Sequence, residues 1–233
     1  MGRTGSTLLA SLLNSHPQIC CEGELFGREQ WPSFQQPIRR LWQHYPWPLL
    51  VYRQGYTRLL RHKPVYGFKL HTKLHGPQIA DTAGFLPRAA CHGWKIIYLE
   101  RQVLYNQVIS ALMTRQTGRY FGSHLEPEQF IPIELSTGAF RDALQQSLSI
   151  RRHQRTLLAQ IPHLKVTYEA DLAHERSWSA TVGRICAYLD LPSPVSVKTK
   201  VSKPWRQPYP ELIRNYADLL TIAHEMASAD EVL

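Results

Sequence analysis

The sequence is poor in acidic residues, in cysteine and in long apolar segments. Its 233 residues include 18 Asp and Glu against 27 Lys and Arg, and only four Cys. No apolar run is long enough to cross a bilayer, and no secretory signal pattern stands at the start. The cysteines show neither metal-ligand spacing nor the density of a disulfide scaffold, so we expect no metal site. We predict a cytoplasmic protein in a reducing compartment, with a peripheral contact to a membrane left open.

The charge balance and the length set the class of protein. The net charge is +9 and the isoelectric point is near 9.5. The basic residues are spread along the chain, so we expect an anionic partner: nucleic acid, an acidic polysaccharide or a multiply charged nucleotide. Apolar residues make up 43% of the sequence, which is typical of a globular protein. We predict a single domain over residues 1–233.

Strand-like and helical segments alternate along the chain, and this alternation predicts an α/β protein with a parallel sheet. Strands are expected at 65–70, 94–99 and 164–168. Helices are expected at 6–13, around Ile79, and at 102–116, 138–160, 178–189 and 211–220.

Residues 27–64 interrupt this alternation. The segment is rich in Trp, Arg, Gln and Pro and has helical patches at 38–44 and 49–61, so we interpret it as a helical insert or lid over a site. Its tryptophans, Trp31, Trp42 and Trp47, have two open explanations. They stack on sugar faces, or they pack between the lid helices.

A loop of small residues opens the chain and leads directly into the first helix. It comprises Arg3, Thr4, Gly5, Ser6 and Thr7. Glycine allows a tight turn and close approach to a ligand, and the unpaired amides of a helix N-terminus favour phosphate or sulfate. Ordinary helix capping by Ser and Thr explains the same pattern. The Gly-Lys-Ser/Thr of a P-loop kinase is absent, which disfavours that class.

A second anion-binding pattern follows the strand expected at 94–99. Arg101 stands at the end of this strand, and Ser110 lies on the next helix. In an open α/β sheet, ligands gather at the carboxyl ends of the strands, where an Arg and a Ser can hold a phosphate. The alternative is that Arg101 pairs with a surface acid. Two anion sites at two strand ends indicate a ligand with two separate anionic groups.

These two motifs together resemble the sulfotransferases that use 3′-phosphoadenosine 5′-phosphosulfate (PAPS). The closer likeness is to bacterial carbohydrate sulfotransferases of the trehalose-sulfating and nodulation-factor type, in which a similar strand, Arg and helix carry Q-x-x-S and then Q-T. Here these positions are Arg101, Gln107, Ser110, Gln116 and Thr117. The Gly-Glu that follows the first helix and a Gly-Lys-Leu strand segment also have counterparts in this chain, at Gly23-Glu24 and at Phe68-Lys69-Leu70 with Gly67 before it.

The resemblance implies a fold. It is a three-layer, P-loop-like parallel sheet flanked by helices, with a helical lid insert. Members of the family place a buried strand of about six residues directly before the anion loop, whereas only Met1 and Gly2 precede Arg3 here. We therefore expect the first strand to be missing from this sequence.

The resemblance also implies how the sulfuryl donor PAPS is bound. Arg3 and the loop residues up to Thr7 are expected to bind the 5′-phosphosulfate, and Arg101 and Ser110 the 3′-phosphate. The family often closes a basic stretch over the nucleotide, and Lys200, Lys203 and Arg206 are the matching residues here. A solvated basic loop explains them equally well. No metal is expected in the reaction.

Transfer to a hydroxyl requires a general base near the sulfur. Glu24 and Glu22 are the candidates, and the Gly-Glu context of the resemblance favours Glu24. His71 and His75 are alternative bases, although an isolated His is more often structural. Lys69 is expected to contact the transferred group or the acceptor, or simply to end a strand.

The branch of the family, rather than any residue, suggests the acceptor: a hydroxyl of a carbohydrate or a glycolipid. A nucleic acid partner is not expected, and the sequence does not indicate the oligomeric state. The rival interpretation is a non-catalytic binder of nucleotides or polyanions that uses the basic surface. A P-loop kinase is the weaker rival.

Overall fold

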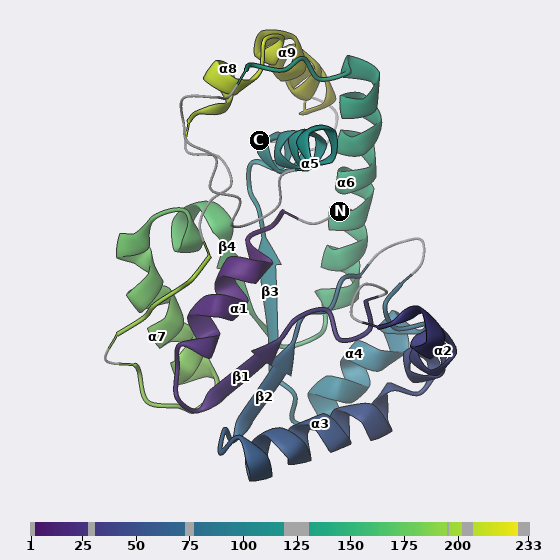
Figure 1. The fold of residues 1–233 in the computed structure, drawn as a ribbon, viewed down its shortest axis with the longest axis vertical. Helices are drawn as coiled ribbons and strands as arrows, with labels where there is room; N and C mark the ends of the chain where they lie inside the picture. Colours follow the sequence, from purple (N-terminus) through teal and green to yellow (C-terminus); the bar gives the residue numbers. More distant parts are fainter. Residues whose placement is uncertain are drawn as a thin grey trace.

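A computed structural model of the chain describes residues 3–27, 31–72, 77–118, 131–194, 196–201 and 207–227. The described chain combines short parallel strands with longer helices (Figure 1). The strands are β1 (Ile19–Glu22), β2 (Val65–Phe68), β3 (Ile96–Glu100) and β4 (His163–Thr167). The α-helices are α1 (Ser6–Asn14), α2 (Gln36–His44), α3 (Pro46–Leu60), α4 (Thr82–Cys91), α5 (Leu104–Thr117), α6 (Thr137–Leu158), α7 (Trp178–Tyr188), α8 (Tyr209–Leu212) and α9 (Tyr216–Ala227). Short helical turns are η2 (Ser33–Gln35), η4 (Tyr168–Leu172) and η5 (Glu175–Ser177).

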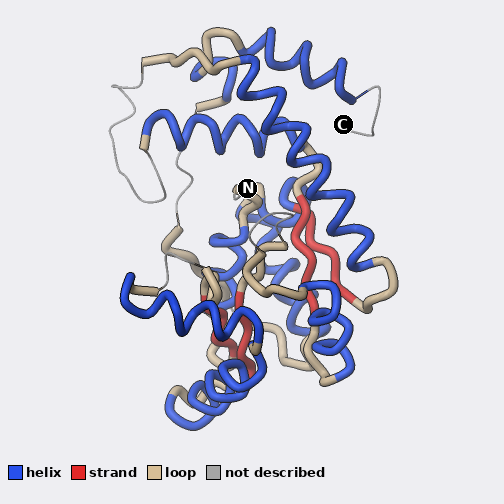
Figure 2. Tube along the Cα trace, turned by 90° about the vertical axis from the view of Figure 1, so that its right-hand side faces the viewer, coloured by secondary structure: helices blue, strands red, loops and turns tan. Residues whose placement is uncertain are grey.

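The strands form two parallel pairs. β1 pairs with β2 in the register Ile19 to Val65, and β3 pairs with β4 in the register Ile96 to His163. Figure 2 shows the two pairs as separate red segments. Within the described residues each sheet has two strands, so β2 and β3 each have one edge without a strand partner.

Most of the predicted elements are confirmed with shifts of a few residues at their ends. β2, β3 and β4 correspond to the strands expected at 65–70, 94–99 and 164–168. α1, α5, α6 and α7 correspond to the long amphipathic segments, and α2 and α3 to the helical patches of the insert. A mixed α/β fold with parallel strands is therefore the observed class.

Three local predictions were wrong. The strand β1 was not predicted, because its four residues are too short to show a period. The helix expected around Ile79 begins at Thr82, since Asp81 is its N-cap and accepts a hydrogen bond from the amide of Gly84 at 2.8 Å. The helix expected at 211–220 is broken into α8 and α9.

Three apolar clusters hold these elements together. The first joins α5 and α6 to α8 and α9 through side chains such as Met113 and Phe140. The second packs β2 and α4 against the insert, with Leu50 and Phe85 at its centre. The third joins α1 to β1, β4 and α7. No helix in the described ranges has the length and apolar character needed to cross a membrane.

Candidate functional site

The anion loop enters α1 at Gly5, a position where any other residue would be strained. Gly5 is the N-cap of α1, with φ of 92°, in the left-handed region that favours glycine. A Cβ on this residue would lie 2.6 Å from Cδ2 of Tyr168. The loop backbone is therefore pressed against the ring of Tyr168, with the start of α1 directly behind it.

The residues predicted to bind two separate anionic groups lie in one cluster. Nε of Arg3 donates to Oγ of Ser110 at 3.1 Å. Nη1 of Arg101 donates to the carbonyl oxygen of Arg3 at 3.2 Å. The anion loop, the end of β3 and the second turn of α5 thus meet, although they are about 100 residues apart in the sequence.

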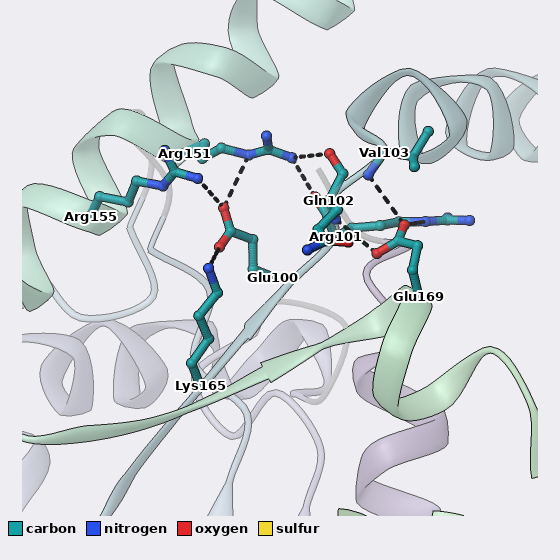
Figure 3. Close-up of polar contacts among 8 residues, drawn as sticks. All are labelled: Glu100, Arg101, Gln102, Val103, Arg151, Arg155, Lys165 and Glu169. Atoms are coloured by element: carbon teal, nitrogen blue, oxygen red, sulfur yellow. Dashed lines mark hydrogen bonds and ion pairs between the residues drawn. The ribbon is translucent and has the colours of Figure 1, made fainter. Parts of the chain in front are cut away.

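Arg101 is held from two sides by residues that follow β4. Its Nε lies 3.4 Å from Oε1 of Glu169, and its guanidinium lies 4.4 Å from the ring centroid of Tyr168, which is a cation–π contact. Glu169 also accepts hydrogen bonds from the amides of Gln102 and Val103 at 2.8 and 3.3 Å (Figure 3). Pairing with an acid, the alternative explanation for Arg101, is therefore observed with Glu169, and its role toward a phosphate stays a prediction.

A buried carboxylate anchors the strand that delivers Arg101. Glu100 is 5% exposed and contacts Lys165 at 2.6 Å and Arg155 at 2.7 Å, with Arg151 at 3.5 Å (Figure 3). Burial raises the pKa of Glu100, but hydrogen bonds from Lys165 and Arg155 outweigh it, and the pKa lies below its ordinary value. Arg151 also donates to the carbonyl oxygens of Arg101 and Gln102. The turn after β3 is therefore fixed in position.

Lys69 reaches the anion loop from the end of β2. Its Nζ donates to Oγ1 of Thr7 at 3.3 Å, and its amide donates to the carbonyl oxygens of Glu22 and Gly23. The ends of β2 and β3 thus both contact the loop, through Lys69 and Arg101 respectively. The loop is bordered by positive charge from both strand pairs.

Glu24 lies at the centre of a closed polar network. Its Oε1 is 2.9 Å from Nε2 of His71, and its Oε2 accepts from Nε2 of Gln78 at 2.9 Å. Gln78 in turn accepts from the amide of His71 at 3.0 Å. The side chain of Glu24 is 35% exposed. The carboxylate is therefore oriented by two partners and still open to a substrate.

Glu22 faces a different set of partners. Its Oε2 accepts from the hydroxyl of Tyr66 at 2.9 Å, and its Oε1 lies 3.4 Å from Nη1 of Arg53 on α3. Burial and the charge of Glu22 raise the pKa of Tyr66 above its ordinary value. These contacts tie β1 to β2 and to the insert, which is a structural role.

Of the basic residues expected to close over the nucleotide, only Lys200 lies within the described residues. Lys203, Arg206 and His75 lie outside the described residues. Lys200 is exposed on the segment 196–201, which approaches α1 through a 2.9 Å hydrogen bond from Thr199 to Ser11.

The insert tryptophans are used for packing. Trp31, Trp42 and Trp47 are all partly buried against the second apolar cluster. The ring of Trp47 lies 5.1 Å from that of Phe85, and Nε1 of Trp31 donates to the carbonyl oxygen of Leu25. Of the two explanations for these residues, helix packing is the one observed.

A cavity of about 600 Å³ adjoins the anion loop. All of the residues 64–72, which include β2, and 94–101, which include β3, line it. Side chains alternate between the two faces of a strand, so a cavity that touches successive residues runs along the strand edges. The apolar residues Leu9 and Leu13 of α1 and Ile150 and Leu157 of α6 also line it.

Sequence reasoning missed several residues that shape the site. Tyr168 and Glu169 directly follow β4, so the rule that located Arg101 after β3 also applies to them. Gln78 and Arg151 carry no such signal, because each reaches the site from a segment distant in sequence. In the described part of the chain, no group of three His, Cys, Asp or Glu side chains is placed to hold a metal ion.

Two comparisons with known proteins bear on this site. Residues 1–194 match the profile of a family described as the sulfotransferase family. Nodulation protein H of Rhizobium tropici is 32% identical over 128 residues, which are 52% of this chain. The matched segment is 46% of that protein, so the chain spans about half the length of this relative.

Proposed function

Because this chain belongs to the sulfotransferase family, we propose that it moves a sulfuryl group from PAPS to a hydroxyl of a carbohydrate or glycolipid. The observation that carries this proposal is the contact of Arg3 with Ser110 and Arg101 beside the left-handed Gly5. Two guanidinium groups at the N-terminus of a helix suit a ligand with two anionic groups.

The residues present fit such a donor. Thr4, Ser6 and Thr7 offer hydroxyls and backbone amides at the start of α1, where the helix dipole favours negative charge. We assign this loop and Arg3 to the 5′-phosphosulfate. Arg101 and Ser110 are assigned to the 3′-phosphate, with Glu169 and Tyr168 holding Arg101 in place. Lys203 and Arg206 remain predictions as further contacts to the nucleotide.

The proposed reaction is an in-line displacement at sulfur. The acceptor oxygen forms a bond to sulfur as the bond between sulfur and the bridging phosphate oxygen breaks, and adenosine 3′,5′-bisphosphate leaves. Negative charge develops on the leaving oxygen, and Arg3 and the amides of the loop are the groups that stabilise it. Lys69, which contacts Thr7, adds a positive charge on the side of β2.

Glu24 is the proposed general base, which takes the proton of the acceptor hydroxyl. Its hydrogen bonds with Gln78 and His71 fix the orientation of the carboxylate, and its partial exposure leaves it accessible. His71 then acts through Glu24 as a positioning residue rather than as an alternative base. Glu22 is less suited, because its side chain is less exposed, at 21% against 35% for Glu24, and is paired with the cation of Arg53.

A carbohydrate-type acceptor is supported by the similarity to nodulation protein H. The acceptor class therefore rests on this relative. A cytoplasmic location remains a prediction from the sequence.

The arrangement of the strands suggests how the two sheets are completed. The cavity lined by β2 and β3 is also lined by residues of α1 and α6, two helices that lie to either side of β3 in Figure 1. We propose that one further parallel strand, the strand that the family places before the anion loop, belongs in this cavity. The four described strands and this one then form a single layer between helices, as in a P-loop-like fold.

The direct test is transfer of radioactive sulfate from PAPS to a panel of mono- and oligosaccharides and glycolipids. The proposal expects a labelled sulfated product with the full chain, formed about 10²–10⁴-fold more slowly by Glu24→Gln. Absence of product together with tight binding of heparin would support the rival function, a non-catalytic polyanion binder.

A further inference from the structure

Helix α2 presents an apolar stripe to solvent. Phe34, Ile38, Leu41 and Tyr45 recur at helical spacing and are 78, 50, 52 and 65% exposed. Isolated exposed apolar residues are normal on a soluble protein, but a contiguous stripe marks an interaction surface. The stripe is long enough to cover the whole of α2.

The opposite face of α2 is the one that packs on the protein. Arg39 donates to Gln36 and to the carbonyl oxygen of Phe26, and Gln43 donates to that of Pro77. Arg39, Gln43 and the partly buried Trp42 therefore face the protein. Ile38 and Leu41 instead face solvent, where large apolar side chains are unusual on a surface helix.

Helix α3 continues the stripe. Tyr52, Tyr56 and Leu59 are exposed on one face, whereas Leu50 and Thr57 on the other face are buried. The exposed Tyr45 lies between the two helices and connects the apolar residues of α2 with those of α3 along the chain. In Figure 1 α2 and α3 lie at the end of the molecule opposite α8 and α9.

The insert that carries the stripe is positively charged, although its Arg53 is paired with Glu22 of β1. No Asp or Glu occurs between residues 30 and 80. The described insert, residues 31–64, contains the cations Arg39, Arg40, Arg53, Arg58, Arg61 and Lys63. Arg61 lies 5.6 Å from the ring centroid of Tyr56. Basic residues interleaved with Tyr and Leu are typical of a surface that enters the headgroup region of an anionic bilayer.

We propose that the stripe formed by α2 and α3 docks on an anionic lipid surface. A second copy of the chain fits less well, because it would bring two acid-free, cationic inserts together. Docking does not depend on the proposed function. It adds to that function a location for the acceptor, because the insert is joined to the segment that follows Glu24 through hydrogen bonds to Leu25 and Phe26.

Vesicle co-sedimentation tests the proposal with the full chain. The probes are vesicles of phosphatidylcholine alone and of an equal mixture of phosphatidylcholine and phosphatidylglycerol. We expect binding to the mixed vesicles that weakens as salt is added. Each exposed arginine near such a surface contributes about fivefold in affinity, so Arg40→Gln with Arg58→Gln should lower binding by about 25-fold. The matched control is Arg115→Gln with Arg176→Gln, two exposed arginines outside the insert.

A second pair of variants tests how much the apolar side chains contribute to vesicle binding. Leu41→Ser with Tyr52→Ser should reduce vesicle binding at least tenfold, by loss of buried apolar area at roughly 25 cal/mol per Å². Ile131→Ser, which removes an apolar side chain that is 72% exposed elsewhere, should leave binding unchanged. Circular dichroism checks that each variant remains folded. Equal binding by all variants, or no binding to the mixed vesicles, would overturn the proposal. A concentration-dependent dimer that Leu41→Ser dissociates would overturn it in favour of self-association.

Discussion

Glu22 and Glu24 show how two nearby carboxylates acquire different roles. β1 ends at Glu22, and the chain then turns, with the amide of Leu25 bonded to the carbonyl oxygen of Gly23. Because of this turn, Glu22 meets Tyr66 and Arg53, whereas Glu24 meets His71 and Gln78. The sequence could identify both acids, but only the turn separates them.

The first prediction concerns Glu24. Replacing it by Gln removes the proposed proton acceptor while keeping the size of the side chain. Turnover should fall by about 10²–10⁴-fold, with the affinity for adenosine 3′,5′-bisphosphate within about twofold of the wild type, because no predicted nucleotide contact is altered. Steady-state sulfate transfer and calorimetry measure the two quantities.

The matched variant is Glu22→Gln. It should weaken the contacts with Tyr66 and Arg53 and lower the thermal stability slightly, with little change in turnover. If Glu22→Gln abolishes turnover and Glu24→Gln does not, the assignment of the base is reversed.

At the residue scale, the sequence could be used to predict cationic and hydroxyl groups that follow recognisable elements. Arg3, Ser110 and Arg101 meet as a strand-end site requires. Glu169, which orients Arg101, follows β4 and was open to the same rule. Gln78, which orients Glu24, could not be predicted, because the separation of the two segments in sequence gives no indication of their distance in space.

The turn from the anion loop into α1 is the first feature at the scale of elements. Gly5→Ala should destabilise the protein by more than the 1–2 kcal/mol or so of a left-handed alanine, because its Cβ would also clash with Tyr168. Gly93→Ala is the matched control, since φ is 82° there and no atom lies within 4 Å of the position that its methyl group would take. Urea unfolding of both variants measures their free energies of unfolding. A similar loss of stability in the two variants would contradict the predicted clash with Tyr168.

The buried Glu100 makes the anchoring of β3 dependent on pH. Its folded-state pKa is lowered from 4.5, so its contribution to stability is present above that pH and is lost as the pH falls through the folded-state value. Glu100→Gln should lower the free energy of unfolding at pH 7 by about 3 kcal/mol, and this difference from the wild type should shrink below pH 4.

Urea titrations at pH 7 and pH 3.5 check this prediction. Glu134→Gln, which changes an exposed carboxylate, should have little effect at either pH. A difference between wild type and Glu100→Gln that stays constant with pH would show that Glu100 has the same pKa in the folded and unfolded protein, and would contradict the lowered folded-state pKa.

The predictability of elements followed their length. α6 has 22 residues and a sustained apolar face, and it was predicted within one or two residues at each end. β1 has four residues and was missed. The break between α8 and α9 was also missed, because Ile213 is extended there and pairs with Ile133 from a distant segment. Such tertiary pairing overrides local helix propensity.

At the scale of the whole molecule, the two strand pairs stand apart across a cavity of about 600 Å³. The sequence could indicate parallel strands, since helices separate them, but not the order of the strands, because parallel pairing joins residues that are distant in the chain. In the mainly apolar strand β3, the apolar side chains of Ile97 and Leu99 are only half-buried. The unpaired edges of β2 and β3 account for this incomplete burial.

An added strand should therefore stabilise the molecule. A segment of about six alternating Val and Ile residues, fused ahead of Met1, should enter the cavity and raise the melting temperature. It should also slow hydrogen exchange of amides in β2 and β3. A Gly-Ser segment of the same length is the control, and equal effects of the two segments would contradict a strand site between β2 and β3.

The most direct test of a two-anion donor site is calorimetry with adenosine 3′,5′-bisphosphate, compared with adenosine 5′-phosphate and ATP. We predict that the 3′,5′-bisphosphate binds most tightly. Arg101→Ala should weaken its binding by at least tenfold, since charged hydrogen bonds contribute about 1.5–3 kcal/mol. Arg115→Ala, an exposed arginine on the last turn of α5, should not change it. Equal affinity for the three nucleotides, or binding unchanged by Arg101→Ala, would contradict a two-anion donor site.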